Sequence, residues 1–312
     1  MTTDVATTYA RWGHHHTRPL GQGMEGTVHH LGPGPLGTDL VAKAWYTRTS
    51  TDLAPLRAFL DELADQHLPF ATPRILHIRH HHDTTITVEP HLHGTPLGTL
   101  TEQGTLTHAR AQDAVTHVLT ALHRTRAGHA THALPVLDET RPLWEGHTTW
   151  AGALTGLLRR RTARFASSLR AALPDLDTLL DALVERLHRL PEGPARIVHG
   201  DLCPPNVLAT PEGTPTAVLD WGFATTAGDP LFDTATTAGF YDMYGPEART
   251  WDDALLTRWT GESEADRVRA LLYRAVYGLA GANAYSEDGD DGHFTWCVHT
   301  FERSDVRAAL GM

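Results

Sequence analysis

The sequence of 312 residues predicts an α+β protein of two lobes, a small strand-rich amino-terminal lobe and a larger, mainly helical carboxy-terminal lobe. Short extended segments and turns dominate the chain up to about residue 90, whereas helical periodicity dominates after Gly94. The segment EPHLHG lies between the strand-rich and the helical part of the sequence and indicates a short hinge. We therefore divide the chain into lobes of residues 1–92 and 93–312.

The amino-terminal lobe is expected to be a small sheet with one helix. Leu56, Phe59 and Leu63 recur at the spacing of one helical face. The turn clusters GPGPLG at 32–37 and RHHHDT at 79–84 separate extended runs, as in antiparallel strands. The expected strands are 18–20, 27–31, 40–45, 74–78 and 85–92, and the expected helix is 53–68.

The carboxy-terminal lobe is expected to be built from helices. A leucine stripe at helical spacing follows Pro174, a residue type that favours the first turn of a helix. Between Asn206 and Asp220 the sequence instead predicts a hairpin with the turn PEGT. The expected helices are 107–126, 149–165, 174–190, 267–285 and 293–310.

The charge of the chain argues against nucleic acid as a partner. Asp and Glu number 37 against 26 Lys and Arg, a net charge of −11, and a polyanion needs a basic face. Residues 201–312 hold 18 acidic and 7 basic residues while 1–200 hold 19 of each, which favours a cationic partner for the helical lobe. With no leader pattern and no apolar run near the roughly 20 residues of a membrane helix, we expect a cytoplasmic protein without membrane contact.

Arginine accounts for 25 of the 26 basic residues, and the single lysine is Lys43. Lysine is a compact point charge that often binds phosphate, although a surface lysine that persists by chance is an equal alternative. Lys43 lies in the apolar run DLVAKAW, where a charged group needs a reason. A nucleotide phosphate beside this strand would supply that reason.

A glycine-rich segment, GQGMEGTV, precedes this strand. Gly21, Gly23, Gly26 and Val28 follow the spacing G-x-G-x-x-G-x-V, which lets backbone amides approach phosphate oxygens. A strand follows, not the helix of a dinucleotide-binding fold, which favours a kinase-type loop. Taken alone, the pattern arises more often from a plain hairpin turn.

The strongest motif is VHGDLCPPNVL. His199, Asp201 and Asn206 have the spacing of a kinase catalytic loop, with Gly200 in place of an arginine. Fourteen residues after Asn206, Asp220 begins the sequence DWG, and the hairpin between them is expected to bring the two side chains together.

These residue types suit phosphoryl transfer, which depends on positioning and charge neutralisation. Asp201 can accept the proton of an attacking hydroxyl, and Asn206 with Asp220 offers the oxygen ligands that Mg²⁺ prefers. His199 is expected to fix the loop by hydrogen bonding.

The motifs HGDLxxxNVL, LDWG and GDPLFDTA together resemble the aminoglycoside phosphotransferase and choline kinase family. Protein kinases differ, since they carry HRD, DFG and APE motifs that this sequence lacks. The resemblance covers about residues 18–240 and implies a bilobal protein-kinase-like fold. It also implies ATP or GTP as donor, Mg²⁺ as cofactor and the hydroxyl of a small molecule as acceptor.

The resemblance assigns nucleotide binding to the first lobe, and catalysis and acceptor binding to the second. Asp229 and Asp233 fall on the pattern GDP-x-x-D, where we expect a supporting role beneath the site. Backbone groups near the hinge are expected to hold the base. The implied nucleotide-binding residues are Gly21, Gly23, Gly26, Val28, Lys43, Glu89, His91 and Leu92.

The acidic partner of Lys43 does not follow from the resemblance. The family usually places a glutamate on the first helix, at the position that Leu56 occupies here. Asp61 and Glu62 lie nearby but off that helical face, and Asp52 near the helix start is a further candidate.

The acidic run SEDGDDG has two interpretations. It is either a solvated loop or a rim that attracts a polycationic acceptor through Glu287, Asp288 and Asp290. The histidine triplets at 14–16 and 80–82 are expected to be solvated turn residues, since neither has the spacing of a metal site.

The expected function is an ATP- or GTP-dependent O-phosphotransferase that inactivates a cationic, aminoglycoside-like antibiotic, as a monomer or homodimer. A metabolic kinase for choline, an amino acid or a sugar is the alternative, and a catalytically silent nucleotide-binding regulator is a third. A choline site requires an aromatic cage. The candidates for such a cage are Trp251, Trp259, Tyr273 and Trp296.

Overall fold

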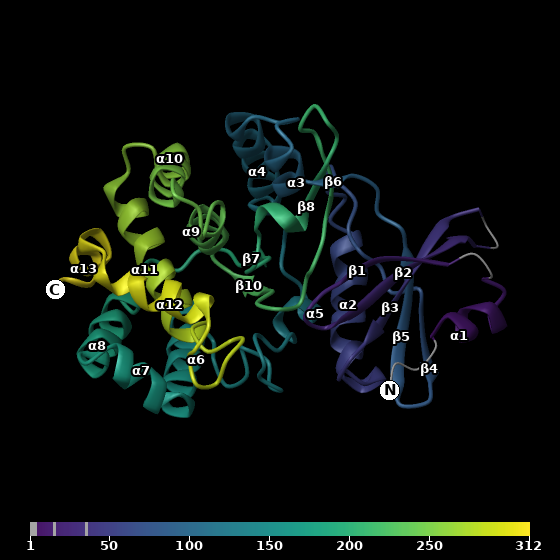
Figure 1. Ribbon diagram of the computed structural model, residues 1–312. Helices are drawn as coiled ribbons and strands as arrows, with labels where there is room; N and C mark the ends of the chain where they lie inside the picture. The colour runs from purple at the N-terminus through teal and green to yellow at the C-terminus, as the bar shows by residue number, and fades with distance from the viewer. Residues whose placement is uncertain (1–4, 15–16, 35–36) are drawn as a thin grey trace.

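A computed structural model describes residues 5–14, 17–34 and 37–312 of the chain. The first ninety residues form a sheet with two helices, and the rest of the chain is mainly helical (Figure 1). The predicted α+β class is therefore confirmed. His15 and His16 of the first triplet, and Pro35 and Leu36 of the predicted turn, lie outside the described residues.

Five strands form one antiparallel sheet, in the order β1-β2-β3-β5-β4, and four of them lie where the sequence predicted them. The remaining strand, β4, is shifted, because it begins at His77 and includes His80 and His81, which were expected in the turn. Lys43 of β3 lies opposite Val28 of β2 and Thr87 of β5, and Val41 lies opposite Glu89. Because directly opposite residues share a face, these five side chains lie on one face of the sheet. The strands are β1 Arg18–Gln22, β2 Gly26–Pro33, β3 Asp39–Trp45, β4 His77–His81 and β5 Thr84–Pro90.

Helix α2, Ser50–Ala64, begins at a capping box. The Thr49 hydroxyl accepts the backbone N–H of Asp52 at 3.3 Å, and the Asp52 carboxylate accepts the backbone N–H of Thr49 at 2.8 Å. A short helix that the sequence did not reveal, α1 Val5–Arg11, precedes the sheet. The buried face of α2 consists of Leu53, Leu56, Phe59, Leu60 and Leu63.

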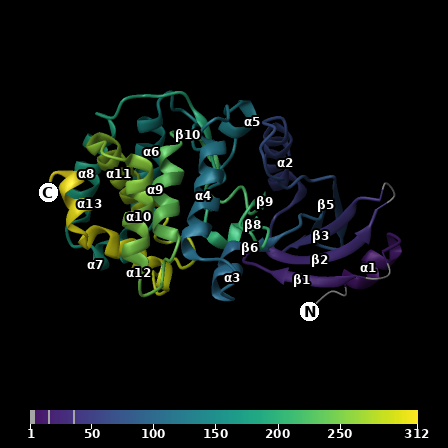
Figure 2. The same cartoon turned by 90° about the horizontal axis from the view of Figure 1, so that it is seen from above.

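Two small sheets lie between the large sheet and the helices (Figure 2). Strand β8, Val207–Ala209, pairs with β9, Pro215–Val218, and forms the predicted hairpin. Strand β8 also pairs with β6, Thr95–Pro96, directly after the hinge. The second small sheet pairs β7, Arg196–Val198, with β10, Thr226–Gly228.

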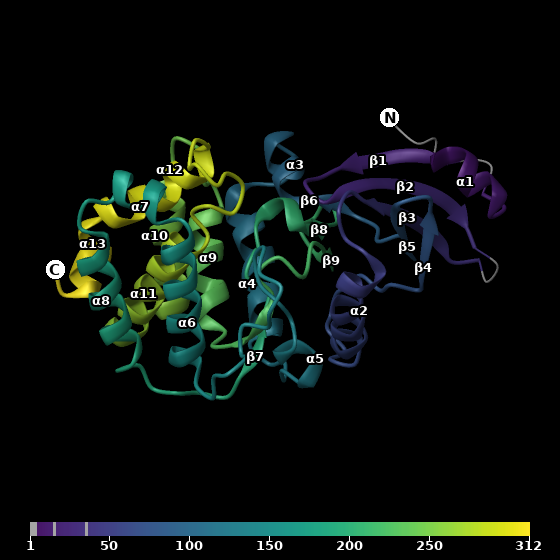
Figure 3. The ribbon, with the colours of Figure 1, turned by 90° about the horizontal axis from the view of Figure 1, so that it is seen from below.

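Helix α11, Glu264–Ala280, is central to the helical part and packs against α6, α8, α9 and α13 (Figure 3).

The prediction of one helix over 293–310 was wrong, because the chain turns at Arg303, whose backbone is extended, with φ −69° and ψ 126°. Two helices and a 3₁₀ turn, Thr300–Glu302, replace it. The other helices are α3 Leu97–Glu102, α4 His108–Leu122, α5 His129–His132, α6 Trp150–Arg164, α7 Ala166–Ala172, α8 Leu176–Leu187, α9 Leu231–Phe240, α10 Ala248–Thr260, α12 Gly292–His299 and α13 Ser304–Leu310.

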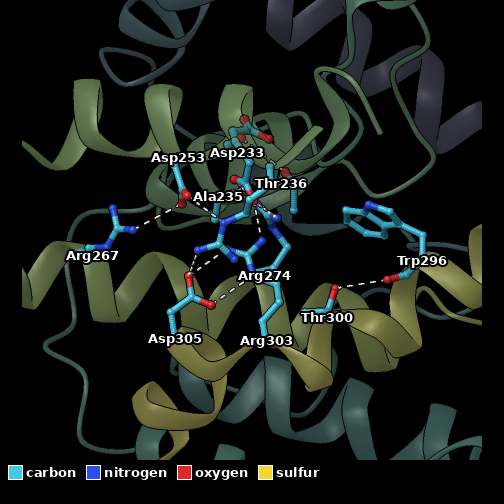
Figure 4. A network of polar contacts seen from close by, with 12 residues as sticks. Asp233, Ala235, Thr236, Asp253, Arg267, Arg274, Trp296, Thr300, Arg303 and Asp305 are labelled. Atoms are coloured by element: carbon cyan, nitrogen blue, oxygen red, sulfur yellow. Dashed lines mark hydrogen bonds and ion pairs between the residues drawn. The ribbon is translucent and has the colours of Figure 1, made fainter. Parts of the chain in front are cut away.

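A buried ion network connects these helices (Figure 4). Arg274 of α11 donates to both carboxylate oxygens of Asp252 in α10, at 3.0 and 2.8 Å, and to the Ala235 carbonyl of α9 at 2.8 Å. Arg303 also binds Asp252. The side chains of Arg274 and Asp252 are only 2% and 5% exposed, so the pair lies within the helical core.

No helix in the described part of the chain combines the length and the apolar character that crossing a membrane requires.

Candidate active site

The glycine-rich loop joins β1 to β2, and its glycines differ in how much space surrounds them. A Cβ on Gly26 would lie 2.2 Å from the Ala44 carbonyl oxygen of β3, so the close pairing of β2 with β3 requires glycine there. A Cβ on Gly21 or Gly23 would contact nothing within 4 Å. The space beside these two glycines is therefore open to a ligand.

Lys43 pairs with a residue of this loop. Its Nζ lies 3.0 Å from Oε2 of Glu25 and 3.8 Å from the centre of the Trp45 ring. The other carboxylate oxygen of Glu25, Oε1, binds Arg48. The backbone of Glu25 is fixed because its carbonyl accepts the N–H of Tyr46 at 2.9 Å. The acidic partner of Lys43 in this structure is thus on the loop and not on α2.

The three carboxylates considered as partners from the sequence have other contacts, which corrects that expectation. Asp52 caps α2 through Thr49. Asp61 binds Arg74 at 3.2 Å. Glu62 accepts the backbone N–H groups of Gly128 and Ala130 at 2.8 Å and so holds the start of α5.

A cavity of about 310 Å³, here called the sheet-side cavity, lies against the shared face of β2, β3 and β5. Glu89 lies on its wall and accepts the Thr87 hydroxyl at 2.6 Å, while Thr87 accepts the indole N–H of Trp45 at 3.1 Å. Burial raises the pKa of Glu89. The lining residues include Gly21, Val28, Val41, Lys43, Glu89, His91, Leu92 and Asp220.

The hinge backbone is partly engaged. The N–H of His91 donates to the carbonyl of Asp39 at 2.8 Å, so this group does not face a ligand as expected. The side chains of Glu89, His91 and Leu92 nevertheless all line the sheet-side cavity.

His199 fixes the catalytic loop. Its Nε2 donates to the Leu219 carbonyl at 2.8 Å, and its Nδ1 accepts the backbone N–H of Asp201 at 3.2 Å. Burial lowers the pKa of His199 to about 4, so the ring is neutral and works as a bridge between the loop and the DWG segment. The expected supporting role agrees with these contacts.

Gly200 explains the departure from the arginine of protein kinases. Its φ is +80°, and a Cβ would lie 2.3 Å from the Ala224 carbonyl oxygen. Asp233, fully buried at the start of α9, accepts the backbone N–H groups of His199 and Gly200 at 2.8 and 2.7 Å. Asp229 accepts the hydroxyl of Tyr273 at 2.7 Å. Asp233 therefore holds the loop directly, whereas the contacts of Asp229 are with Tyr273 of α11 and with the backbone N–H of Leu231 at the start of α9.

Asp201 lies in an environment that favours its protonated form. Burial, and then the nearby charge of Asp220, raise the pKa of Asp201 to about 7. The side-chain nitrogen of Asn206 donates to the Asp201 carbonyl at 2.9 Å, which leaves its amide oxygen available as a ligand. The N–H of Leu219 donates to the Asn206 carbonyl at 2.8 Å and so brings Asp220 beside Asn206.

These donors fit a Mg²⁺ ion. Asp220 and the amide oxygen of Asn206 are hard oxygen ligands, and Asp201 adds a second carboxylate nearby. The backbone of Asp220 has a φ of +56°, an unusual conformation that turns the chain at the motif.

A second cavity of about 670 Å³, the helix-side cavity, adjoins the catalytic loop. Asp220 lines both cavities and therefore lies where they meet. Among the described residues, no Lys or Arg lines the helix-side cavity, although four carboxylates do. Its polar and aromatic lining includes Asp201, Asp220, Glu102, Asp242, His108, Tyr244, Tyr277 and Tyr285.

The residues expected to bind the acceptor lie elsewhere. Glu287, Asp288 and Asp290 do not line the helix-side cavity, and Glu287 binds Arg164 at 2.7 Å. The aromatic candidates also differ, because the lining tyrosines are not among those proposed for a cage. The carboxylates of Glu102 and Asp242 line the helix-side cavity instead. The sequence analysis did not single them out, because about 140 residues separate them and no local motif marks either. The four residues proposed from the sequence as an aromatic cage, none of which lines the cavity, are Trp251, Trp259, Tyr273 and Trp296.

A glycine loop and lysine over one cavity, joined to an HGD loop beside a second, define a phosphotransferase of the kinase-like class. Residues 16–271 match the family model described as the Phosphotransferase enzyme family, APH. The chain belongs to this family, as the motifs predicted. None of the curated proteins matches it in sequence.

Solved structures share the fold. Wild-type aminoglycoside 2'-phosphotransferase-IIIa, in its GDP complex, superposes with a TM-score of 0.57 and 16% identity, over 99% of this chain and 97% of that one. The GDP and kanamycin complex of APH(2")-IIIa gives 0.57 and 17%, over 98% of both chains. The Streptomyces rimosus enzyme APH(3'')-Id, with ADP and streptomycin, gives 0.51 and 18%, over 87% of this chain and 97% of that one.

Proposed function

We propose that this protein is an ATP- or GTP-dependent O-phosphotransferase that inactivates a cationic, aminoglycoside-like antibiotic in the cytoplasm. The observation that carries the proposal is the helix-side cavity, which has four carboxylates and, among the described lining residues, no Lys or Arg. An aminoglycoside carries several ammonium groups, which the carboxylates of such a cavity attract. Two of the four, Asp201 and Asp220, belong to the catalytic motifs, so Glu102 and Asp242 remain for the acceptor.

The mechanism follows from the order of the groups. The sheet-side cavity would hold the nucleotide, with Lys43 and the glycine loop at its phosphates. Asn206 and Asp220 would hold Mg²⁺, which when bound neutralises phosphate charge. An acceptor hydroxyl in the helix-side cavity would donate a hydrogen bond to Asp201, which takes the proton as the oxygen attacks the terminal phosphorus. The bond from that phosphorus to the bridging oxygen breaks, and the nucleoside diphosphate leaves. A base with a pKa of about 7 suits proton transfer near neutral pH.

A panel of acceptors tests this function. Consumption of ATP and GTP is measured with aminoglycosides, other cationic antibiotics, choline, amino acids and amino sugars, with no acceptor as the control. Stimulation by an aminoglycoside supports the proposal. Stimulation by choline or an amino acid alone assigns a metabolic kinase, and binding of nucleotide without any stimulation assigns a regulator.

Glu102 and Asp242 are expected to determine acceptor affinity. Glu102→Gln and Asp242→Asn should each raise the KM for a cationic acceptor by about tenfold, because each removes a charged hydrogen-bond acceptor for an ammonium group. The KM for the nucleotide should not change. Asp288→Asn in the acidic run is the matched control, and a larger effect there would return the acceptor site to that run.

Removing the charge of Glu25 is expected to strengthen nucleotide binding. In this structure its carboxylate binds Lys43 and Arg48, and it would compete with phosphate oxygens for these two cations. Glu25→Gln should lower the Kd for the nucleotide about two- to fivefold, the scale of a partly exposed ion pair. Fluorescence titration measures this, with Asp52→Asn as control. Weaker binding would instead show that Glu25 orients Lys43 toward the phosphates.

A further inference from the structure

We propose that His30, Asp39 and His91 form a Zn²⁺ site at the rim of the sheet-side cavity. Nε2 of His30 lies 2.8 and 2.9 Å from the two carboxylate oxygens of Asp39. Nδ1 of His91 lies 2.9 Å from Oδ2 of the same carboxylate. One ligand atom from each residue lies within 4.8 Å of the other two.

The sheet and the first residue of the hinge, His91, bring these side chains together. Val41 of β3 lies opposite both His30 of β2 and Glu89 of β5. Asp39 precedes Val41 by two residues, and His91 follows Glu89 by two residues. Because side chains alternate along a strand, both project from the same face as this row. The His91 N–H donates to the Asp39 carbonyl at 2.8 Å and fixes the spacing of the two backbones.

The ligand types select a transition metal over Mg²⁺. Two imidazole nitrogens and one carboxylate oxygen suit Zn²⁺, whereas Mg²⁺ prefers oxygen ligands alone. Bonds of about 2.1 Å in tetrahedral geometry place neighbouring ligand atoms roughly 3.4 Å apart, a small expansion of the two distances between a ring nitrogen and the carboxylate. A bound Zn²⁺ would replace the present hydrogen bonds, because the ring nitrogens that now bind the Asp39 carboxylate would become ligands of the metal.

A fourth position remains for water or a further histidine. The ring of His93 lies 4.4 Å, centre to centre, from the ring of His91. The His93 carbonyl accepts the Thr216 hydroxyl of β9 at 2.7 Å. A metal bound to His91 would therefore hold the hinge to β2 and β3. On its other side, the hinge is joined to the small sheet by His93.

The site is coupled to the cavity through His91, which lines it. A bound Zn²⁺ would fix the hinge wall, so one equivalent should tighten nucleotide binding. This coupling rests on the proposed function, whereas the metal site does not. Absence of phosphotransfer would therefore contradict the proposed function alone, and absence of zinc binding would contradict the metal site alone.

The test uses the full chain without an affinity tag, since its 22 histidines already offer weak sites. After treatment with EDTA, calorimetric titration with Zn²⁺, repeated with Co²⁺ by visible absorption, should show one tight site. His30→Ala, Asp39→Asn and His91→Ala should each weaken it by more than about tenfold. His117→Ala, an exposed histidine on α4, should leave it unchanged.

Circular dichroism of each variant in EDTA establishes that it is folded before titration. Retention of the tight site in all three variants would overturn the proposal. So would an equal loss in His117→Ala, which would show dispersed binding by surface histidines. Asp39→Asn keeps the shape of the side chain, so a selective loss in that variant assigns the carboxylate as a ligand.

Discussion

Asp201→Asn is expected to lower kcat by about 10²- to 10⁴-fold, the range that a positioned general base contributes. The amide keeps the size of the side chain, and the Asn206 side chain still donates to the residue 201 carbonyl at 2.9 Å. The KM for the nucleotide should therefore change little. Steady-state kinetics with the best acceptor of the panel measures the effect, and a variant that keeps more than a tenth of the activity would exclude Asp201 as the base.

The same substitution is expected to stabilise the protein in the absence of ligands. The pKa of Asp201 rises from 3.8 in its ordinary state to about 7 in the fold. A carboxyl whose folded pKa is raised costs stability as the pH increases from about 4 to about 7, because the unfolded chain releases the proton first. Asp201→Asn removes this cost, which is at most about 4 kcal/mol above pH 7.

Urea unfolding at pH 8 and pH 4 measures this gain. The midpoint for Asp201→Asn should exceed that of the wild type at pH 8, and the two should converge at pH 4. An equal midpoint at pH 8 would show that contacts of the carboxylate compensate for its burial. Lower activity with higher stability is the pattern of a strained catalytic group.

The motifs that the sequence revealed are those whose geometry is local. The HGD loop precedes the β8–β9 hairpin and DWG follows it, so Asn206 and Asp220 approach through the pairing of β8 with β9. Lys43 likewise reaches its cavity by alternation along β3. Their catalytic roles remain predictions, although the family and the fold class are confirmed by the family match and the shared fold.

Features that depend on distant packing were not predictable in this way. Helix α9 was missed because every residue of Leu231–Phe240 is buried, so no amphipathic stripe marks it. Glu25 became the partner of Lys43 only because the β2–β3 pairing folds the loop back over that strand. The two acceptor candidates, Glu102 and Asp242, line one cavity although they are far apart in the chain.

Asp252→Ala is expected to destabilise the protein by about 3–5 kcal/mol, the cost of leaving a buried charge without its partner. Burial alone would raise the pKa of Asp252, but Arg274 and Arg303 outweigh it and hold the pKa below its usual value. Without Asp252, the guanidinium of Arg274 keeps only the Ala235 carbonyl among the contacts described above. Helix α9, which carries Asp233 beneath the catalytic loop, would then lose a support.

Asp253→Ala is the matched control. Asp253 is the next residue in the same helix, but its carboxylate is 40% exposed and binds Arg249 and Arg267 at the surface. Its cost should not exceed about 1 kcal/mol. Urea midpoints compare the two variants, and an equal cost would show that the buried pair contributes no more than a surface one. Asp252→Leu combined with Arg274→Met should recover much of the loss, because removing both charges leaves neither unpaired in the core.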